Sequence, residues 1–543
     1  RRARNCCDGS PRAAPALHRF AETYSSCVEQ PVQRLFFALA AHMNYRVFGG
    51  DAKDAYAHSP PPARPTFVEI DDAYADWYTH RFGSPPDRSK VLPVQHALQG
   101  HPESGRLWEQ HISTILLSPD FNFRSTTHDK SIYRGEFDGH PIFLLRQVDD
   151  FALAAPDESI ARAIYTRIGE LLQLPSETQP PFSYLGLIDD FNGVDVHQYH
   201  DRTILSCERY IDRVLRSHGW TTPSHDELPD SNKPQSPLPI DAIPTLYSTD
   251  GYPEGTPEHQ ALAARFGFNY RTLLGELLYA YVTCRPDIGY AVITLSKFSS
   301  SPGEYHFAML KKVAKYLRRT RCWGIHFHRT TPDLALPPCP FTAMSADPSL
   351  PTFPSLESGA ALTGFIDAAH ANDLRKRRST TGYAFILAGG AVSYKCKTQP
   401  LTATSSTEAE FYAAVSAGKH ARYLRAILHE LGFPQTRPTP LYCDNESAIN
   451  MVNARIPTER SRHILIQFFA IQDWKDAGDI ILKHIPGIIN PSDDLTKPLG
   501  WILHSRHSRR LMGHYATSSS CHLDCSIHDP NIIPDFDQGR VSN

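Results

Sequence analysis

Two clusters of proline divide the chain into three blocks, each of which can build its own core. Eight prolines fall between Pro223 and Pro257, and seven fall between Pro332 and Pro354. Helix interiors and central strands do not tolerate this density, because proline lacks a backbone N–H and clashes with the preceding turn. We therefore predict linkers over 223–257 and 331–358. The remaining segments are a short N-terminal stretch, three folded blocks and a C-terminal tail: 1–20, 21–222, 258–330, 359–500 and 501–543.

Length and composition exclude several classes of protein. The 543 residues give room for several buried cores, and 55 Lys and Arg against 58 Asp and Glu leave a net charge of −3. A balance this close to zero argues against a protein that coats nucleic acid or an anionic membrane along its whole surface. No run approaches the roughly 18 apolar residues of a membrane span, so we expect no membrane segment.

The cysteines and the first residues bear on the cellular setting. Eleven cysteines are scattered along the chain without the spacing of a disulfide framework, which indicates a reducing compartment. The chain begins Arg1-Arg2-Ala3-Arg4, with no Met and no apolar stretch behind the charges. We expect no secretory signal, and we expect the chain to be part of a longer translation product.

The first two blocks differ in their expected secondary structure. In the first block, the apolar runs 142–145 and 151–155 have strand length, whereas 32–42 has helical spacing, which together is an α+β pattern. The middle block is mostly helical, because 270–282 and 304–319 both carry apolar residues at helical spacing.

The third block reads as a mixture of strands and one long helix. A strand over 362–366 is followed by a hairpin with Gly389-Gly390 at its turn. A helix from about residue 407 to 431 and a strand over 441–443 come next. The tail 501–543 is polar and has no clear period, so we expect it to be loosely ordered.

Three acids of the first block suggest a metal centre. Asp149 and Asp150 lie between two apolar runs, at an expected hairpin tip, where adjacent like charges repel unless a cation neutralises them. On its own, this pair is better explained by a solvated turn. Asp51, about a hundred residues upstream, adds a third acid, and Tyr56 follows it by five residues. Three carboxylates that hold two Mg²⁺ ions, with an aromatic against the nucleotide sugar, are what a nucleotide polymerase needs.

At this point the sequence resembles a known family. Asp51 to Tyr56 resembles the first palm motif of reverse transcriptases, and Gln147-Val148-Asp149-Asp150 resembles their Tyr-x-Asp-Asp box. The stretch from Ala97 to Trp108 is similar to the template-contacting segment of copia-type LTR retrotransposon polymerases. Tyr184-Leu185-Gly186 is similar to the family's primer-grip turn. The segments Tyr270 to Gly275 and Arg285 to Ile288 resemble its connection, so the match extends over roughly residues 20–500.

The resemblance implies an α+β polymerase palm and fingers with a helical thumb and connection. Asp51, Asp149 and Asp150 would coordinate two Mg²⁺ or Mn²⁺ ions. The backbone amides around Lys53, Asp54 and Ala55 would face the triphosphate of the incoming dNTP. Tyr56 would act as the gate against a ribose 2′-hydroxyl. Residues 1–20 match the family's fingers poorly, so no triphosphate-binding residue is assigned there.

The same resemblance implies contacts with template and primer. Gly100, Arg106, Tyr184 and Gly186 stand in segments that would touch nucleic acid. Gln147 stands where the family usually has Tyr, which alters a primer or template contact while both neighbouring metal ligands remain.

Four acids of the third block form a second set. Asp367 follows one expected strand and Asp444 follows another, Glu410 lies on the long helix, and Asp493 comes late in the block. This order is the carboxylate quartet of an α/β RNase H-like domain, a mixed five-stranded sheet with helices, in which two Mg²⁺ ions activate water. Three short segments again resemble the copia-type polyprotein: Arg378 to Tyr383, Ser406 to Glu410 and Thr496 to Leu499.

Two of these acids have a close neighbour that could replace them. Glu408 and Glu410 are separated by about 200° around a helix, so they cannot both face one ion. The family pattern favours Glu410, which leaves Glu408 as a solvated or capping acid. The spacing to Thr496-Lys497 selects Asp493 over Asp494.

Local basic strips offset the near-neutral charge. Lys311, Lys315 and Arg318 fall on one face of the expected helix 304–319, a spacing suited to a phosphate backbone, although exposed helices also carry such residues for solubility. Arg377, in a run of four basic residues near Asp367, is a second candidate for contact with a hybrid duplex.

We therefore predict an RNA-directed DNA polymerase with RNase H activity. Its expected partners are an RNA template, a DNA primer, dNTPs and an RNA–DNA hybrid, with gag, protease and integrase regions upstream in the polyprotein. The resemblance implies assembly in cytoplasmic virus-like particles, with the nucleus as an alternative location. Two other interpretations remain: a decayed remnant that binds nucleic acid without polymerising, and a nuclease whose polymerase half is inert.

Overall fold

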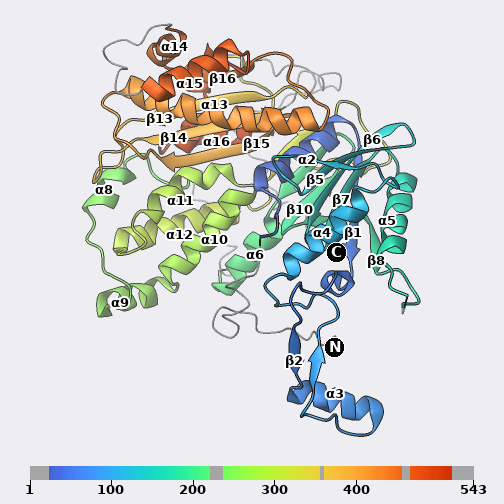
Figure 1. Ribbon diagram of the computed structural model, residues 1–543. Coiled ribbons are helices and arrows are strands. Elements are labelled where there is room, and N and C mark those ends of the chain that lie inside the picture. The colour runs from blue at the N-terminus through green and yellow to red at the C-terminus, as the bar shows by residue number, and fades with distance from the viewer. Residues whose placement is uncertain (1–23, 176, 221–235, 355–359, 455–464, 516–543) are drawn as a thin grey trace, which may run out of the picture. The chain divides into compact units, whose positions relative to one another are not determined.

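The computed structural model describes residues 24–175, 177–220, 236–354, 360–454 and 465–515, which belong to two compact units (Figure 1). The first unit combines the chain up to Glu29 with Tyr45–Ile188, and the second combines Gln30–Asn44 with Asp189–Asn543. Helix α2 (Gln30–His42), which precedes most of the first unit in sequence, therefore belongs to the second.

A six-stranded antiparallel sheet forms the centre of the first unit. Its strand order is β4-β5-β6-β7-β1-β8. The apolar runs predicted as strands are the cores of β6 and β7, where nearly every residue is buried. The strands are β1 (Arg46–Ala52), β4 (Arg124–Ser125), β5 (Ile132–Phe137), β6 (His140–Gln147), β7 (Asp150–Ala155) and β8 (Phe182–Leu187).

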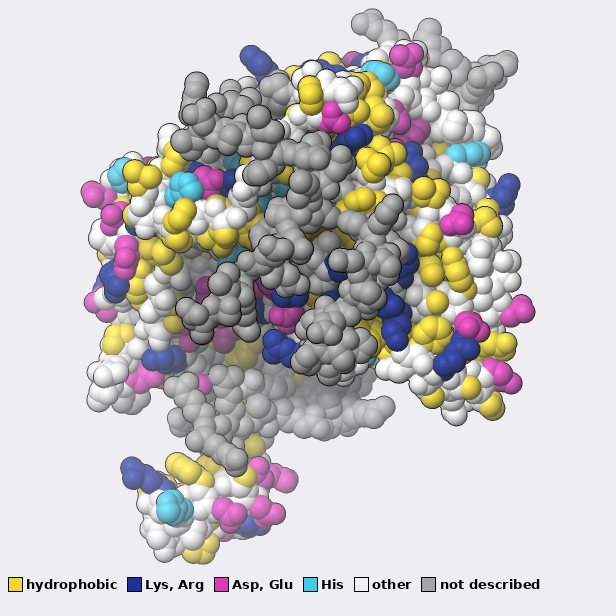
Figure 2. Space-filling view, turned by 180° about the vertical axis from the view of Figure 1, so that it is seen from behind, with side chains coloured by type: hydrophobic (Ala, Val, Ile, Leu, Met, Phe, Trp, Pro, Cys, Tyr) yellow, Lys and Arg dark blue, Asp and Glu magenta, His cyan; other side chains and the backbone are white. Residues whose placement is uncertain are grey.

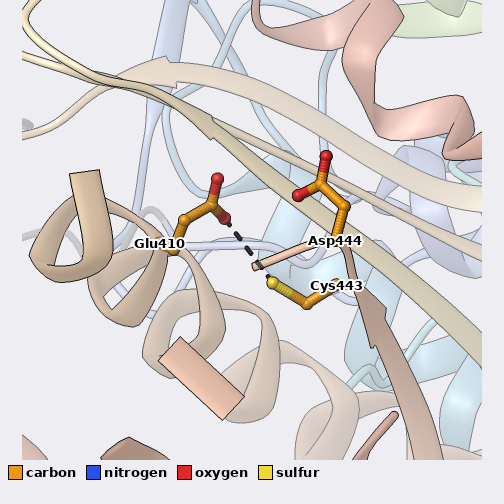
Figure 3. Close-up of side chains that lie close together, drawn as sticks. All are labelled: Glu410, Cys443 and Asp444. Carbon is orange, nitrogen blue, oxygen red and sulfur yellow. Dashed lines mark hydrogen bonds between the residues drawn. The ribbon is translucent and has the colours of Figure 1, made fainter. Parts of the chain in front are cut away.

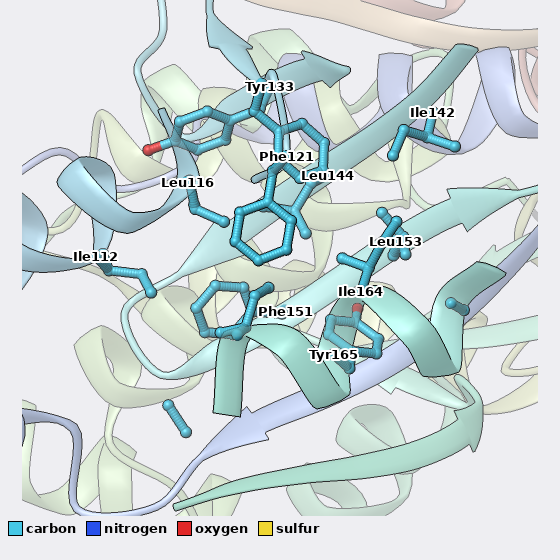
Figure 4. Packing of buried hydrophobic residues seen from close by; sticks show 14 of the residues in the cluster. Ile112, Leu116, Phe121, Tyr133, Ile142, Leu144, Phe151, Leu153, Ile164 and Tyr165 are labelled. Carbon is cyan, nitrogen blue, oxygen red and sulfur yellow. The ribbon is translucent and has the colours of Figure 1, made fainter. Parts of the chain in front are cut away.

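Two helices cover this sheet and close its core. Helix α5 (Glu158–Leu172) begins at Asp157, whose side chain accepts a hydrogen bond from a backbone N–H of the first turn. Its buried residues, such as Ile164 and Tyr165, pack against Phe151 of the sheet (Figure 4). The other elements of this unit are η1 (Ala55–His58), β2 (Phe67–Glu69), α3 (Asp72–Phe82), β3 (Val91–Pro93) and α4 (Ser104–Leu116).

The second unit contains a four-stranded antiparallel sheet with helices. Its order is β12-β11-β10-β9, and Arg202 of β11 lies opposite His328 of β12. This pairing joins segments far apart in sequence, which explains why the unit begins at Asp189 and not after the predicted block 21–222. The elements are β9 (Asp190–Phe191), β10 (Val194–Gln198), β11 (Arg202–Ser206), α6 (Glu208–Ser217), α8 (Ala242–Ser248), α9 (Pro257–Phe266), α10 (Tyr270–Thr283), η2 (Pro286–Ile288), α11 (Gly289–Ser296), α12 (Glu304–Arg319) and β12 (Ile325–His328).

A mixed five-stranded sheet completes the second unit, as predicted. Its order is β15-β14-β13-β16-β17. Strand β14 pairs antiparallel with both β13 and β15, whereas the pairs β13–β16 and β16–β17 are parallel. The long helix α13 (Ser406–Glu430) runs across this sheet (Figure 1). The other elements are β13 (Thr363–Ala369), β14 (Thr380–Leu387), β15 (Gly390–Thr398), β16 (Thr439–Cys443), α14 (Glu446–Asn453), α15 (Leu465–Asp476), β17 (Ile480–His484), η4 (Gly487–Ile489), η5 (Pro491–Leu495) and α16 (Trp501–Leu511).

Two segments predicted to lack helices contain them. Helix α8 lies inside the predicted linker 223–257, where Pro244 stands in its first turn, a position that does not require a backbone N–H. Helix α16 lies in the tail 501–543, which we expected to be loosely ordered. Its buried face includes the polar residues His504, His507 and Ser508. The helical spacing of apolar residues, from which most helices are predicted, is therefore weak here.

Other predictions concern segments without regular structure. Residues 331–354, the described part of the second linker, contain no helix or strand beyond a single bridge between Met344 and Tyr515. The predictions for 1–20 and for 516–543 lie outside the described residues. Within the described ranges, no helix has the length and apolarity needed to cross a membrane.

Candidate metal centres

Asp51, Asp149 and Asp150, here called the first centre, lie where two central strands of the first unit's sheet, β1 and β7, meet at one end. Asp51 of β1 lies opposite Asp150 of β7, and the N–H of Ala52 donates to the carbonyl of Asp149 at 2.9 Å. Strands β6 and β7 form the predicted hairpin, with Gln147 opposite Asp150 across its tip. The strand pairing therefore places all three acids at one end of two adjacent strands.

The first centre is open to solvent. Asp150 is exposed, and Asp51 and Asp149 are half-buried. Among the described residues, the sets of three metal-binding side chains whose donor atoms lie within 4.8 Å of one another occur only in the second unit. The first centre thus aligns its carboxylates at the ends of adjacent strands without drawing them into a tight cluster.

Side chains hold the tip of the β6–β7 hairpin. The Gln147 Oε1 accepts a hydrogen bond from the N–H of Val28 at 2.9 Å. The indole N–H of Trp108 donates to the carbonyl of Val148 at 2.7 Å. Gln147, which replaces the family's usual Tyr, therefore ties the N-terminal segment to the hairpin.

The segment predicted to face a triphosphate is only partly free to do so. The N–H of Lys53 donates to the carbonyl of Pro181 at 2.8 Å, so this amide is engaged, contrary to the prediction. Asp54 has the left-handed φ of 50° and starts η1, and Ala55 packs into the core. Tyr56 is half-buried, and burial together with the charge of a predicted ligand at the hairpin tip raises its pKa.

In the first unit, residues predicted to touch template or primer make contacts within the protein. Arg106 pairs with Glu103 at 3.5 Å between Nη2 and Oε1. Tyr184 packs against the core, and it lies with Gly186 in strand β8 and not in the predicted turn, because β1 pairs with this segment across a bulge. Gly100 has φ of 90°, which glycine adopts readily.

The predicted basic strip of the second unit lines a pocket. Lys311, Lys315 and Arg318 of α12 surround about 160 Å³ together with Leu215 and Trp220. The Lys311 Nζ lies 5.7 Å from the centre of the Trp220 ring. Elsewhere basic and acidic side chains alternate over the visible face (Figure 2). Local strips, and not a uniform field, are therefore the basic surfaces that could meet phosphates.

Arg377, the other predicted phosphate contact, is exposed in the turn between β13 and β14. Its φ of 51° is left-handed, and its backbone N–H donates to the carbonyl of Asp373 at 2.6 Å. The side chain is thus displayed by a turn that its own backbone closes.

The four acids predicted in the third block, here called the second centre, converge in the structure. Asp367 lies on β13, Asp444 follows β16, Glu410 lies on α13 and Asp493 lies on η5. Donor atoms of Asp367, Asp444 and Asp493 lie within 4.8 Å of one another, and so do those of Glu410, Cys443 and Asp444. The two sets share Asp444, so all four acids border one site.

Burial dominates the electrostatics of the second centre. Asp367, Glu410 and Asp493 are 2%, 5% and 9% exposed. Burial, with the charges of Asp367 and Asp444, raises the pKa of Glu410 to about 9. Burial and the charge of Asp367 raise the pKa of Asp493 to about 8. Clustered carboxylates that resist ionisation fit a divalent cation, because oxygen ligands are what hard cations prefer.

A lysine and a threonine that we did not predict as site residues reach into the second centre. The Lys497 Nζ lies 3.0 Å from Asp493 Oδ1 and 3.6 Å from Asp367 Oδ2. Burial lowers the pKa of Lys497, but the charges of Asp367 and Asp493 outweigh it and hold the pKa above its ordinary value. The Thr496 hydroxyl donates to Asp367. The word Thr496-Lys497 was visible in the sequence, but only the fold shows where it points.

The acids next to Glu410 and Asp493 have other partners. Glu408 is buried and not solvated, and it accepts hydrogen bonds from the Thr404 N–H at 2.7 Å and the Tyr412 hydroxyl at 2.9 Å. It therefore caps the start of α13. Asp494 is buried and lies 2.5 Å from His504 Nδ1 of α16.

A buried network continues from Asp494 and supports η5. The His504 Nε2 lies 3.0 Å from the Tyr316 hydroxyl, which donates to Asp287 Oδ2 at 2.7 Å. Arg285 donates to both oxygens of Asp287, at 2.9 and 2.6 Å, with both side chains fully buried. The helices of the middle block and α16 thus fix the backbone next to Asp493.

Comparison with known proteins relates most of the chain to the polyproteins of transposons. Residues 2–230 match the family model described as reverse transcriptase (RNA-dependent DNA polymerase). The chain is 27% identical over 490 residues to the retrovirus-related Pol polyprotein from transposon TNT 1-94 of Nicotiana tabacum, an alignment that covers 88% of this chain and 32% of the relative. The chain spans about a third of the length of this and two other Pol polyproteins, from the transposons RE1 and RE2 of Arabidopsis thaliana.

Solved structures show weaker likenesses. A foamy viral protease-reverse transcriptase in complex with dsDNA is 11% identical and covers 87% of this chain and 73% of that chain, with a TM-score of 0.39. The RNase H1 named LC11, isolated from compost, is 14% identical and covers 25% of this chain and 93% of that chain, with a TM-score of 0.21.

Residues 2–230 match the reverse transcriptase family model, and the Pol polyproteins from transposons align with 88–91% of the chain. The chain belongs to the copia-type retrotransposon Pol polyproteins. Its second unit carries the mixed sheet and the carboxylate set predicted for an RNase H-like domain.

Proposed function

We propose that the chain copies RNA into DNA at the first centre and degrades the RNA of the resulting hybrid at the second. The observation that carries the proposal is the convergence of four sequence-predicted carboxylates in a chain of this family. The substrates would be an RNA template, a DNA primer, dNTPs and an RNA–DNA hybrid. Mg²⁺ or Mn²⁺ would serve both centres.

At the first centre, Asp51, Asp149 and Asp150 would hold the divalent ions. When bound, such ions lower the pKa of the primer 3′-hydroxyl and neutralise the triphosphate. The chain's own contribution is alignment, since the β1–β7 pairing sets Asp51 against Asp150. Tyr56, beside the hairpin tip, would pack against the sugar and exclude a 2′-hydroxyl.

At the second centre, Asp367, Glu410, Asp444 and Asp493 would hold the ions. When bound, such ions activate a water and stabilise the leaving oxygen of a phosphodiester. The Thr496 hydroxyl orients the Asp367 carboxylate that it contacts. The local basic strips would bind phosphates without reading sequence, so binding would weaken as salt increases.

The context of the chain is part of the proposal. The relatives are Pol polyproteins, so we place gag, protease and integrase regions in the same polyprotein, and we place the process in cytoplasmic particles, with the nucleus as the alternative.

One assay with two variants tests the proposal. The purified chain is given a primed RNA template with dNTPs and Mg²⁺, and separately a labelled hybrid. Asp149→Asn should abolish extension and leave hybrid cleavage intact, whereas Asp444→Asn should do the reverse. Failure of the parent chain to extend the primer would sink the polymerase claim.

A nuclease with an inert polymerase half is the second candidate. It is favoured by the first centre, whose acids do not cluster, and by Arg106 and Tyr184, which the protein itself engages. Cleavage without extension by the parent chain would select this candidate. Absence of both activities, with retained hybrid binding, would select the decayed remnant.

A further inference from the structure

A thiol lies among the carboxylates of the second centre. Thr439, Leu441 and Cys443 are the buried residues of β16, so Cys443 faces inward immediately before Asp444. The Cys443 Sγ lies 3.8 Å from Glu410 Oε2, and the two side chains and Asp444 point toward one another (Figure 3). One donor atom from each of Glu410, Cys443 and Asp444 lies within 4.8 Å of the others.

The two donor sets of the second centre differ in chemistry. Asp367, Asp444 and Asp493 offer oxygen only, which suits a hard ion such as Mg²⁺. The set with Cys443 adds sulfur, which suits borderline and soft ions such as Zn²⁺. Because Asp444 belongs to both sets, an ion in one set alters the other.

We propose that Glu410, Cys443 and Asp444 form a thiolate-containing site for Zn²⁺, with water as its fourth ligand. On binding, the S–H bond of Cys443 breaks, the sulfur keeps the electron pair and bonds to the ion, and the proton leaves to solvent. A proton held by Glu410 leaves in the same way. Zn²⁺ remains divalent, so the step requires no oxidant or reductant.

The separation of the sulfur and the Glu410 carboxylate suits this ion. Zinc binds thiolate sulfur at about 2.3 Å and carboxylate oxygen at about 2.0–2.2 Å, so tetrahedral geometry separates the two ligands by about 3.5 Å. The observed separation of Cys443 Sγ and Glu410 Oε2, 3.8 Å, is close to this value. Burial and the charge of Glu410 raise the pKa of the Cys443 thiol, so the ion must displace its proton. The backbone N–H of Asn445, 3.4 Å from Sγ, donates to the sulfur and partly offsets this cost.

Access to the site comes through Asp444. Cys443 and Glu410 are buried, whereas Asp444 is half-buried and gives the site its contact with solvent. Since Zn²⁺ would occupy Glu410 and Asp444, it would displace Mg²⁺ from them and inhibit hybrid cleavage. Only this consequence rests on the proposed nuclease; binding of the ion does not.

Titration of the full chain with Co²⁺ and Zn²⁺ tests the site without any nucleic acid. Co²⁺ should produce a near-ultraviolet thiolate-to-cobalt band in the parent chain, and Zn²⁺ should abolish it. Cys443→Ser, which keeps a small polar side chain, should lose the band and weaken Zn²⁺ binding at least about tenfold. The matched control is Cys396→Ser, another buried cysteine of the same unit, on β15, which should keep both.

A second variant guards against misfolding as the cause. Asp444→Asn keeps the thiol but removes a ligand, so it should also weaken Zn²⁺ binding about tenfold or more while its far-ultraviolet circular dichroism matches the parent. An unchanged cobalt band in Cys443→Ser, or unchanged Zn²⁺ affinity in Asp444→Asn, would overturn the proposal. If the parent chain cleaves no hybrid, the proposed nuclease fails while the metal titration still decides this one.

Discussion

The two carboxylate centres keep like charges together in opposite ways. The first centre leaves Asp150 exposed and Asp51 and Asp149 half-buried, where water screens their repulsion. The second centre buries three of its four acids, and protons on Glu410 and Asp493 together with the ammonium of Lys497 offset the charge. In an open site, water screens the carboxylate charges until a cation binds. In a buried site, protons or a neighbouring cationic side chain must neutralise them.

This difference has a consequence for stability. Carboxyl groups that are forced to keep protons oppose folding at neutral pH, because the unfolded chain releases those protons freely. The second centre should therefore cost stability when metal is absent and recover it when metal binds. The first centre should show little of either effect.

The largest expected effect comes from the buried network behind the second centre. Asp287→Asn leaves the fully buried guanidinium of Arg285 without its carboxylate, which should destabilise the chain by about 3 kcal/mol. Urea unfolding followed by tryptophan fluorescence measures the loss. Asp212→Asn, which removes partly exposed ion pairs with Arg216 and Arg321, is the control and should cost less than about 0.5 kcal/mol. Equal losses in the two variants would contradict the importance assigned to the network.

The next effect tests the comparison directly in metal-free protein. The pKa of Glu410 is raised to about 9, so between about pH 5 and 9 the folded chain keeps a proton that the unfolded chain releases. Stability should fall as pH rises through that window. Glu410→Gln does not titrate and should stabilise the chain by roughly 2 kcal/mol at pH 8.

The matched variant in the first centre is Asp149→Asn. It should change metal-free stability by less than about 0.5 kcal/mol, since the group is half-buried and close to solvent. Thermal unfolding at several pH values with a chelator compares the two variants. If stability depends on pH in the same way in Glu410→Gln and in the parent, the proton held by Glu410 does not destabilise the folded chain.

A smaller effect concerns the internal cation. Lys497 pairs with Asp493 at 3.0 Å, but its side chain is 39% exposed, so Lys497→Met should cost only about 1 kcal/mol in metal-free protein. Removal of this competitor should also tighten Mg²⁺ binding several-fold, as measured by calorimetry. Lys395→Met, an exposed lysine on β15, is the control and should change neither quantity. Weaker Mg²⁺ binding by Lys497→Met would show that the lysine assists the metal.

Local patterns explain why much of the fold could be predicted from the sequence. The hairpin at Asp149 and Asp150, the helix over 304–319 and the mixed sheet follow from apolar runs, turn residues and strand-end acids, all of which act over a few residues. The choice of Asp493 over Asp494 rested on spacing, and Asp494 indeed has other partners, on α16.

The features that sequence could not reveal depend on distant contacts or on polar burial. The boundary at Asp189 follows from the pairing of β11 with β12, far along the chain. Helix α16 was missed because His504 and Ser508 face Asp494 and not an apolar core. The Lys497 side chain reaches the second centre only because η5 folds back against β13, a contact between elements more than a hundred residues apart.

The last expected effect sharpens the comparison at the first centre, where Gln147 and Trp108 hold the hairpin tip. Gln147→Leu removes the acceptor for the buried N–H of Val28, which should cost about 1 kcal/mol and speed hydrogen exchange of that amide. Gln110→Leu, which removes an exposed acceptor for Arg106, is the control and should cost less than about 0.5 kcal/mol. If exchange at Val28 is unchanged, Gln147 does not tie the segment. The open centre would then depend on strand pairing and on the Trp108 hydrogen bond to Val148, whereas the buried centre has a network behind it.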